Sequence, residues 1–326
     1  MKKIWLFFGG MSNEAEVSIN SAKNIIKNFD YKKYQLILIY RDKDGTFYTI
    51  NNIGNLWNKK ILPVYDFYKT FDIALPITHG RYWEDGVLQS IFAMQKIKYC
   101  GCRILSSALC MDKSLFRVFI RWQWIPQTKF VAIDLQLMTN GDIEKKIIEA
   151  TKILSLPLYV KPSNSWSSVG ITKVTKHENL HKAIKEASKH DSKILIEEWF
   201  IHPKEVEVAI LGNSKLIVSE PGELLLTKDF YDYEDKYKNN DATVRIPAKI
   251  TSAEKKKIQE LAVKVYKLCD CSGFARIDFF ISGKNIYLNE INTLPWFTDI
   301  SMFPMLMQHH GLSYTQLINK IIELAY

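Results

Sequence analysis

Residues 275–292 have the sequence ARIDFFISGKNIYLNEIN, which predicts a β-hairpin. Side chains alternate between the two faces of a strand, so Arg276 and Asp278 share a face of the first strand, and Glu290 and Asn292 share a face of the second. A tight turn at the central Ser-Gly-Lys would set Asp278 about opposite Glu290 and Arg276 about opposite Asn292. The sequence therefore predicts that four polar groups converge on one patch.

This patch has the composition of a metal site. Two carboxylates and an amide oxygen are hard ligands of the kind that Mg²⁺ takes beside nucleotide phosphates, and a neighbouring guanidinium suits a charged oxygen. The alternative is a surface face with a cross-strand salt bridge. Three oxygen ligands together with Arg276, flanked by apolar Phe279, Phe280 and Ile291, favour the metal site. Its predicted ligands are Asp278, Glu290 and Asn292.

Length and composition place the chain among ordinary globular proteins. At roughly 100 to 200 residues per domain, 326 residues favour two or three domains. The contents of 47% hydrophobic and 24% charged residues exclude disordered, collagen-like and coiled-coil chains. The net charge is +9, but the lysines are scattered, so a solvated surface or an anionic substrate is favoured over nucleic acid. No apolar run approaches the roughly 18 residues that span a bilayer, so we expect no membrane contact and a cytoplasmic location.

The cysteines form two closely spaced pairs, Cys100 with Cys102 and Cys269 with Cys271, and Cys110 lies apart. Paired ligands of a structural zinc site usually have two to four residues between them. The sequence therefore favours small buried side chains over zinc or a disulfide framework.

The first hundred residues alternate apolar runs with a helical pattern. The runs at 4–8 and 36–39 predict strands, and the periodicity between Val17 and Phe29 predicts a helix, which together indicate a parallel β-α-β unit. Asn13 and Glu16 predict a capping box at the helix start, next to a strand end where sites form.

A second α/β segment begins near Arg103. Its helix at 177–189 has a predicted capping box of Thr175 and Glu178, and residues 156–162 predict a strand that ends in a polar loop. We expect an α/β protein of three domains with a functional loop at about 223–245; the domain ranges are 1–102, 103–193 and 194–326.

The polar loop at 161–170 has the sequence KPSNSWSSVG. Its small hydroxyl side chains and backbone N–H groups can wrap a phosphate tail, with Lys161 supplying charge. The alternative is an ordinary Ser/Asn turn. The chain has no Walker or dinucleotide-binding glycine fingerprint.

Taken together, these segments resemble the ATP-grasp superfamily and, within it, the D-alanine:D-alanine ligases of cell-wall synthesis. The resemblance covers the whole chain, and the motifs occur in the family's order at 9–18, 79–86, 111–113, 161–162 with 167–170, 230–237 and 289–295. It implies a three-domain ATP-grasp ligase with an N-terminal parallel-sheet domain and two α+β domains that clasp ATP. It also implies a homodimer.

The resemblance assigns a role to each candidate residue. The ATP phosphates would be bound by Lys113, Lys161, Ser168 and Lys236, and the adenine and ribose by Glu197, Glu198 and Glu205. The hairpin would bind two Mg²⁺ ions, or Mn²⁺ in their place. Glu14 would bind the ammonium of the first D-alanine near His79, and Ser301 with Met302 would line the place of the second. The group that closes the loop over the site would be Glu14, Ser167 and Tyr237.

Each role has a structural alternative when the residue is considered alone. Glu14 could be a helix N-terminal acid, His79 a core or turn histidine, Lys113 a helix cap and Tyr237 a packing residue. Their coincidence in one ordered pattern favours the functional roles.

The implied chemistry passes through an acyl phosphate formed from the first carboxylate and the γ-phosphate of ATP. This step depends mainly on positioning and charge neutralisation. The second amine then attacks, and Arg276 with a backbone N–H near Trp296 would stabilise the tetrahedral oxyanion. The loop at 231–238 would act as a lid that excludes water.

Two tryptophans depart from the family pattern. Trp166 and Trp296 stand where glycine is usual, and glycine serves positions of positive φ or close backbone approach. They leave open a relative that joins a different amino-acid or hydroxy-acid pair. Tyr237 stands where relatives that make an ester usually have histidine, which favours a dipeptide product. A non-catalytic ATP-binding relative is disfavoured because the metal ligands are intact.

Overall fold

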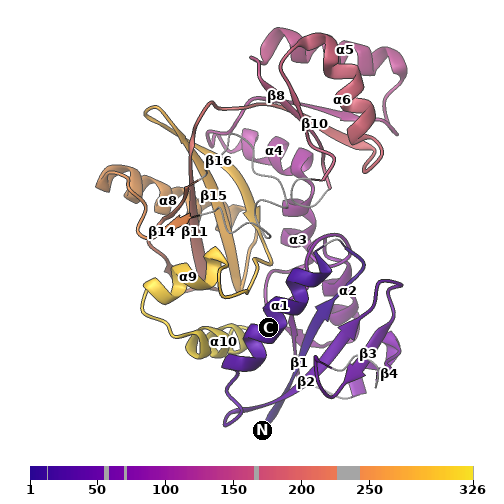
Figure 1. Ribbon diagram of the computed structural model, residues 1–326, viewed down its shortest axis with the longest axis vertical. Helices are drawn as coiled ribbons and strands as arrows, with labels where there is room; N and C mark the ends of the chain where they lie inside the picture. Colours follow the sequence, from indigo (N-terminus) through magenta and orange to yellow (C-terminus); the bar gives the residue numbers. More distant parts are fainter. Residues whose placement is uncertain (13, 55–58, 70–71, 165–168, 226–242, 326) are drawn as a thin grey trace.

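The computed structural model describes residues 1–12, 14–54, 59–69, 72–164, 169–225 and 243–325. Within these ranges the chain forms three β-sheets with helices packed on them, which confirms the predicted α/β class (Figure 1). No helix in the described ranges has the length and apolar character needed to cross a membrane.

The first sheet has the strand order β4-β3-β2-β1-β5-β6. β1 pairs in parallel with β2 and β5, so the predicted parallel β-α-β unit is confirmed, while β3 and β4 add an antiparallel edge. Residues 4–8 are buried because helices and loops cover both faces of the sheet. The elements are β1 (Lys2–Gly9), α1 (Ala15–Asn28), β2 (Tyr34–Arg41), β3 (Phe47–Ile50), β4 (Lys60–Ile61), η1 (Val64–Lys69), β5 (Ile73–Pro76), α2 (Val87–Met94) and β6 (Lys98–Tyr99).

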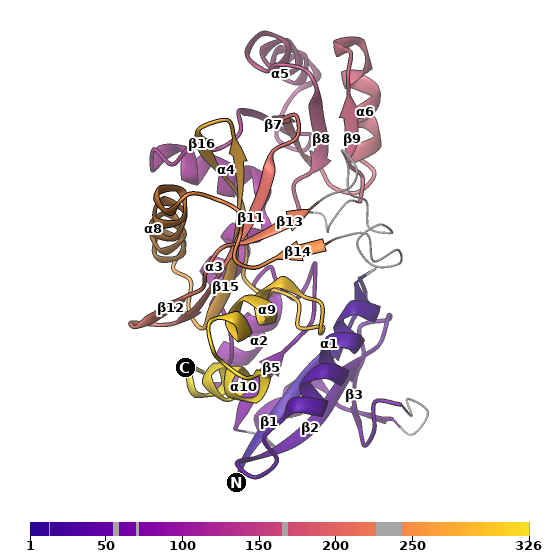
Figure 2. The same cartoon turned by 60° about the vertical axis from the view of Figure 1, so that its left-hand side comes forward.

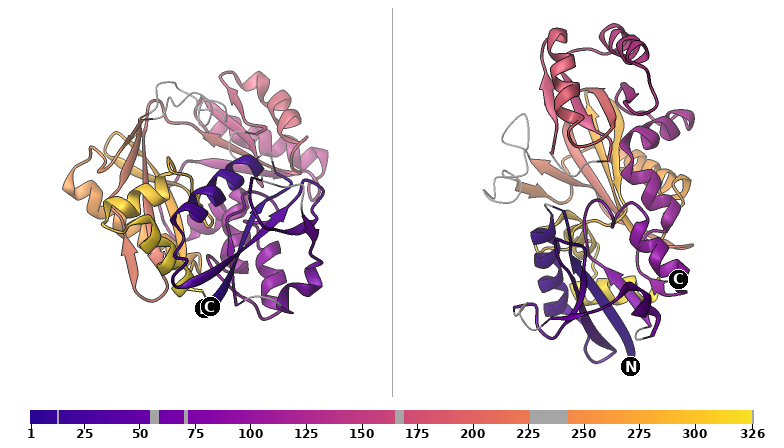
Figure 3. Two further views of the ribbon diagram at one scale, coloured as in Figure 1. Left: turned by 60° about the horizontal axis from the view of Figure 1, so that its bottom comes forward. Right: turned by 90° about the vertical axis from the view of Figure 1, so that its right-hand side faces the viewer.

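The second sheet has the order β7-β10-β8-β9, and β10 is antiparallel to both of its neighbours. With α5 and α6 it forms the end of the molecule farthest from β1 and α1 (Figure 3). The elements of this part are α3 (Ile104–Met111), α4 (Lys113–Trp122), β7 (Phe130–Asp134), α5 (Asn140–Ile153), β8 (Leu158–Pro162), β9 (Thr172–Val174), η2 (His177–Asn179), α6 (Leu180–Ala187) and β10 (Lys193–Glu198).

The predicted capping box at Thr175 and Glu178 is wrong. The helical segment begins with the 3₁₀ turn η2, whose N-cap residue is Lys176, and neither η2 nor α6 has a side-chain cap. Thr175 therefore lies one residue outside the position from which a hydroxyl caps a helix.

The third sheet has the order β14-β13-β11-β15-β16, with β12 paired to β11. α8 packs on one face of it and begins with a capping box of Thr251 and Glu254. Its elements are β11 (Lys204–Gly212), β12 (Leu216–Val218), β13 (Gly222–Leu225), β14 (Thr243–Arg245), α8 (Ser252–Leu268), β15 (Phe274–Ser282), β16 (Asn285–Asn292), α9 (Met302–His309) and α10 (Tyr314–Glu323).

Two parts of the chain pack on sheets that are distant in sequence. Cys110, Phe116 and Ile120 of α3 and α4 share a buried cluster with α8 and β15. The last helices, α9 and α10, share a cluster with β1 and α1, beside which they lie (Figure 2). Through these two shared clusters the third sheet packs against both of the other parts of the chain.

Candidate active site

The hairpin of β15 and β16 has the predicted register. Asp278 lies opposite Glu290, and Arg276 lies opposite Asn292. The Arg276 guanidinium binds both oxygens of Asp278, with Nε to Oδ1 and Nη2 to Oδ2 distances of 2.8 Å. Asn292 Nδ2 donates to Asp278 Oδ2 at 2.9 Å, so three of the four predicted groups are in direct contact.

A third acid, which the sequence analysis missed, extends this row onto β11. Glu207 lies opposite Asp278, is 5% exposed, and its Oε2 is 2.8 Å from Arg276 Nε. Burial by itself lowers the pKa of Arg276, but the charges of Asp278 and Glu207 outweigh this effect and raise it. The alternation of Glu205 and Glu207 with valines in β11 is the signal that could have identified this residue.

The donor set of this row fits Mg²⁺. Within the described residues no three Asp, Glu, His or Cys side chains form a ready metal cluster, so the amide of Asn292 is needed as the third donor. It now donates to Asp278, but the oxygen and nitrogen of an amide exchange places by a half-turn. Two carboxylates and one amide oxygen then match the hard ligands that Mg²⁺ prefers.

In the second sheet, Glu197 of β10 lies between two cations. Its Oε1 is 2.7 Å from Arg117 Nε and its Oε2 is 2.5 Å from Lys161 Nζ, and all three side chains are largely buried. Burial raises the pKa of Glu197, but Arg117 and Lys161 more than offset this and lower it to about 2. Burial lowers the pKa of Lys161, against the opposing effect of Glu197. The site thus holds Lys161 in a fixed position.

Glu197 and Glu198 are neighbours in β10, so their side chains point to opposite faces of the strand. Glu198 Oε1 accepts a hydrogen bond from the Ser155 backbone at 2.8 Å and lies 3.5 Å from Lys129 Nζ. Glu205 lies two residues from Glu207 in β11, on the same face of that strand.

Lys113 is the first residue of α4, and Asp112 caps this helix. Asp112 Oδ1 accepts from the backbone N–H groups of Ser114 and Leu115 at 3.1 Å and from Ser163 Oγ at 2.6 Å. Burial raises the pKa of Asp112, but Lys193 and the hydroxyl donors lower it to about 2. This network joins the start of α4 to Ser163, where the predicted phosphate loop begins.

The first loop brings Glu14 and His79 to the same region. Ser12 Oγ accepts from the Glu14 backbone at 3.2 Å and donates to the His79 carbonyl at 3.0 Å. Glu14 is 4% exposed and precedes α1 without a side-chain cap bond, so it is not a simple capping acid. The predicted capping box paired Asn13 with Glu16; the N-cap position of α1 is instead Glu14, and Asn13 lies outside the described residues.

His79 is fully buried, and its ring centroid is 5.9 Å from that of Trp296 in an edge-on arrangement. Burial lowers its pKa to about 3, against a smaller effect of the Leu294 backbone, so the ring is neutral at neutral pH. Trp296 has no positive φ, so the backbone at this usual glycine position accepts an indole.

Glu84 is a second acid that the sequence analysis missed. Its Oε2 accepts from the Gly80 backbone at 2.7 Å. Burial and the charge of Glu14 raise its pKa, while Lys113 lowers it and Glu290 raises it further. This acid therefore lies within electrostatic reach of groups from the first loop, α4 and the hairpin. The acidic pair at the end of the 79–86 motif was its signal in the sequence.

Ser301 and Met302 lie at the start of α9 and are buried. Ser301 Oγ accepts from the Thr298 backbone at 3.0 Å and lies 2.6 Å from Thr298 Oγ1, which fixes its hydroxyl. Five residues of interest lie outside the described ranges: Trp166, Ser167, Ser168, Lys236 and Tyr237.

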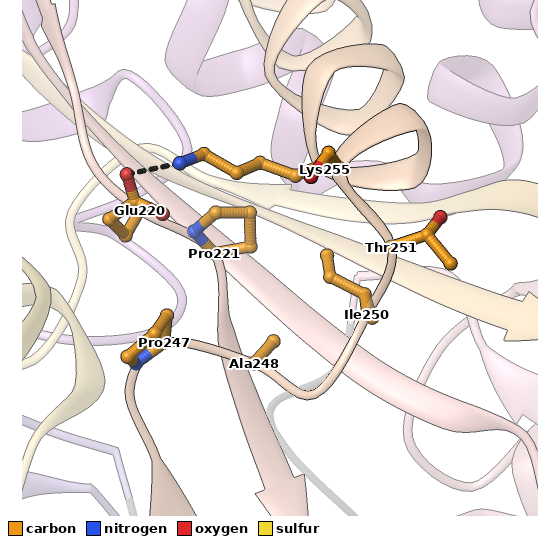
Figure 4. A pocket seen from close by; sticks show the side chains of 8 residues that line it. Glu220, Pro221, Pro247, Ala248, Ile250, Thr251 and Lys255 are labelled. Atoms are coloured by element: carbon orange, nitrogen blue, oxygen red, sulfur yellow. Dashed lines mark hydrogen bonds and ion pairs between the residues drawn. The ribbon is translucent and has the colours of Figure 1, made fainter.

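A separate pocket of about 180 Å³ lies where β13 meets the start of α8 (Figure 4). Lys255 and Glu220, on one side of it, form an ion pair with 2.5 Å between Lys255 Nζ and Glu220 Oε1. None of the predicted site residues is among those that line it, which are Glu220, Pro221, Pro247, Ala248, Ile250, Thr251, Ser252 and Lys255. The pocket is therefore distinct from the candidate active site.

The sequence is similar to D-alanine–D-alanine ligases along nearly its whole length. It is 40% identical to the D-alanine–D-alanine ligase of Caldicellulosiruptor bescii over an alignment of 347 positions, gaps included, which covers 99% of this chain and 94% of the relative. It is 41% identical to D-alanine–D-alanine ligase B of Clostridium tetani, covering 99% of this chain and 93% of the relative.

The fold is similar to solved structures of such ligases. The VanG D-Ala:D-Ser ligase from Enterococcus faecalis superimposes with a TM-score of 0.89 at 35% identity, covering 99% of both chains. The D-alanine–D-alanine ligase from Coxiella burnetii gives a TM-score of 0.86 at 29% identity, covering 99% of this chain and 93% of that one. Residues 3–102 match the D-ala D-ala ligase N-terminus model and residues 120–323 the C-terminus model. The chain therefore belongs to the D-alanine–D-alanine ligase family, which confirms the predicted ATP-grasp fold.

Proposed function

We propose that this protein joins two D-alanine molecules into D-alanyl-D-alanine, with conversion of ATP to ADP and phosphate, for peptidoglycan precursor synthesis. The observation that carries the proposal is the row of Glu207, Asp278 and Glu290 on three adjacent strands, with Arg276 bound between two of these acids. Lys161 lies buried on the neighbouring sheet. The chain therefore has acidic side chains that can bind a cation and a lysine that can bind a triphosphate.

The nucleotide would lie between the second and third sheets. Lys113 and Lys161 would bind its phosphates, with Ser168 and Lys236 adding contacts from the loops, and Glu205 would bind the ribose. Because the Glu197 carboxylate already binds Arg117 and Lys161, its role is to hold Lys161 in place. Glu198 would contribute its backbone to the adenine edge, since its side chain points to the other face.

The ligands Asp278, Glu290 and Asn292 would bind two Mg²⁺ ions, or Mn²⁺ in their place. Ions held by these residues would supply positive charge against the triphosphate. Arg276 keeps Asp278 in a fixed orientation through its two-pronged ion pair.

For the amino acids, Glu14 would bind the ammonium of the first D-alanine beside neutral His79. The carboxylate of this D-alanine attacks the γ-phosphorus and gives an acyl phosphate, with ADP as the leaving group. The amine of the second D-alanine, held near Ser301 and Met302, then displaces phosphate. Arg276 stabilises the oxyanion of that step, and Glu14, Ser167 and Tyr237 would hold the lid closed against water.

The identity of the second substrate is tested by direct comparison. The similarity to the VanG D-Ala:D-Ser ligase favours D-serine as the candidate to compare with D-alanine. A coupled assay of ADP release with D-alanine alone, with D-alanine plus D-serine, and with D-alanine plus D-lactate, followed by product analysis, tests the assignment. Dipeptide from D-alanine alone at neutral pH supports the proposal. A dominant mixed dipeptide or ester would replace the assigned product.

The same assay separates an enzyme from a non-catalytic nucleotide-binding relative. ATP binding without amino-acid-dependent ADP release would exclude ligase activity. We further propose a homodimer in the cytoplasm, with neither nucleic acid nor membrane as partner. The family relationship and the scattered lysines support this part of the proposal.

A further inference from the structure

The β15–β16 hairpin contains a β-bulge at Asn289. Ser282 pairs with Asn285 at the turn, and regular pairing continues to Phe279 and Leu288. The next pair is Asp278 with Glu290, which leaves Asn289 as one extra residue in β16.

This extra residue decides which way Glu290 points. Without it, Asp278 would lie opposite Asn289, and Glu290 would lie opposite Ile277, whose side chain is buried in the cluster under α8. With it, Leu288 and Ile291 both remain in that cluster, while Glu290 turns to the face of Asp278. The metal-ligand row therefore depends on the bulge.

Arg117 of α4 binds the bulge from a distant part of the chain. Its Nη1 donates to the Leu288 carbonyl at 2.9 Å, and its Nη2 lies 3.4 Å from Asn289 Oδ1. The segment after α4 adds to this contact, because the Leu288 backbone donates to the Pro126 carbonyl at 2.8 Å. Gln127 Nε2 in turn donates to the Arg117 carbonyl at 2.7 Å.

The same guanidinium reaches the nucleotide side of the site. Arg117 Nε is 2.7 Å from Glu197 Oε1, and the other oxygen of Glu197 binds Lys161. The Arg117 side chain is only 3% exposed, so its donors are satisfied by these partners and not by water. One buried arginine thus joins the proposed phosphate lysine to the strand that carries a proposed metal ligand.

We infer that Arg117 is a positioning residue that holds the Asn289 bulge and thereby sets Glu290 for cation binding, while fixing Lys161 through Glu197. This inference rests on the proposed function, because it assumes that Glu290 binds Mg²⁺. An arginine is required because different nitrogens of its planar guanidinium contact Glu197 and the bulge at the same time. A lysine has only one ammonium group and cannot reach both.

The test compares Arg117→Lys with Arg121→Lys. Arg121 lies one turn later in α4, where it packs on Phe130 and contacts neither Glu197 nor β16. Arg117→Lys keeps a cation beside Glu197 but removes the fork. We expect the Mg²⁺ concentration for half-maximal ADP release to rise by about 10-fold or more, as for residues that orient a metal ligand. The KM for D-alanine should stay at the value of the Arg121→Lys control.

A second variant keeps the test decisive if the buried substitution impairs folding. Asn289→Ala leaves Arg117, Glu197 and Lys161 in place and removes one side-chain acceptor on the bulge. We expect a smaller rise in the Mg²⁺ requirement, with a melting temperature close to that of the unsubstituted protein. A normal Mg²⁺ requirement in both variants, whatever their stability, would overturn the inference.

Glu290→Gln separates this inference from the proposed function beneath it. If Glu290→Gln retains normal turnover and a normal Mg²⁺ requirement, the proposed metal site itself is wrong. If Glu290→Gln is inactive while Arg117→Lys and Asn289→Ala have the unsubstituted Mg²⁺ requirement, the metal site stands and only the role of Arg117 is wrong.

Discussion

Lys161 and Glu197 lie diagonally across the antiparallel strands β8 and β10, with 2.5 Å between Nζ and Oε2. Arg117 binds the other oxygen of the same carboxylate, so one buried anion serves two buried cations. Removal of the Glu197 charge should be strongly destabilising, because the two buried cations would keep their cost of desolvation without a partner.

The first prediction concerns this carboxylate. Glu197→Gln leaves Lys161 and Arg117 without a counter-charge, and we expect the free energy of unfolding at pH 7 to fall by about 3 to 5 kcal/mol. Urea unfolding measures the change. The matched control is Glu198→Gln, which alters a contact near the surface and should cost less than about 1 kcal/mol. Equal losses in the two variants would contradict the central role of Glu197.

The second prediction concerns the hairpin. Glu290→Gln is isosteric and removes one anionic oxygen ligand, so we expect D-alanine-dependent ADP formation to be abolished while the circular dichroism spectrum is unchanged. Glu260→Gln, on the outer side of α8, is the control and should retain full activity. Normal turnover of the Glu290 variant would remove this residue from the metal site.

The third prediction concerns the pH dependence of stability. The pKa of folded His79 is lowered to about 3, so between pH 3 and its unfolded value near 6.5 the unfolded chain binds the extra proton. The contribution of neutral His79 to the free energy of unfolding is therefore fully present above about pH 6.5, and it is lost as the pH decreases. His79→Asn should flatten this fall by up to about 1.4 kcal/mol per pH unit, as measured by urea unfolding.

The comparison is best made between pH 4.5 and 6.5. Asp112 and Glu197, whose pKa values are lowered to about 2, also lose their stabilising effect on acidification, but only below the unfolded carboxyl values. An unchanged slope in the His79 variant within this window would show that the ring is not buried in its neutral form.

The fourth prediction concerns the thiols. Four of the five cysteines are buried and all are free, and burial raises the pKa of Cys102 and Cys110. Since the thiolate is the reactive form, a disulfide reagent such as Ellman's reagent should modify at most one thiol rapidly in the native protein. All five should react in guanidinium chloride. Rapid native modification of several thiols would contradict the packing of α3 on α8.

The hairpin shows how far the sequence alone could lead. Strand alternation correctly grouped Arg276 with Asp278, and the expected pairing of Asp278 with Glu290 is confirmed. A regular tight turn, however, would have paired Asp278 with Asn289, so the register depends on the bulge. Its contact with Arg117 spans 171 residues, and such a long-range contact leaves no periodic signal in the sequence.

Other differences have equally local causes. Glu207 and Glu84 were visible as acids in apolar or motif settings, but only the fold shows that they face the site. The boundary expected after residue 193 we now propose to lie after Glu198, because β10 pairs within the second sheet. Strand pairing of this kind is set by tertiary packing and is weakly encoded in a single segment.

The packing of α9 and α10 on β1 and α1 has a consequence for how the protein is made. The strands of the first sheet are synthesised within the first hundred residues of this sequence, yet part of the surface that covers them is made about 200 residues later. The nascent sheet must therefore wait, with an apolar face uncovered, until α9 and α10 have left the ribosome. A stalled product that ends before α9 would expose that face to chaperones and proteases.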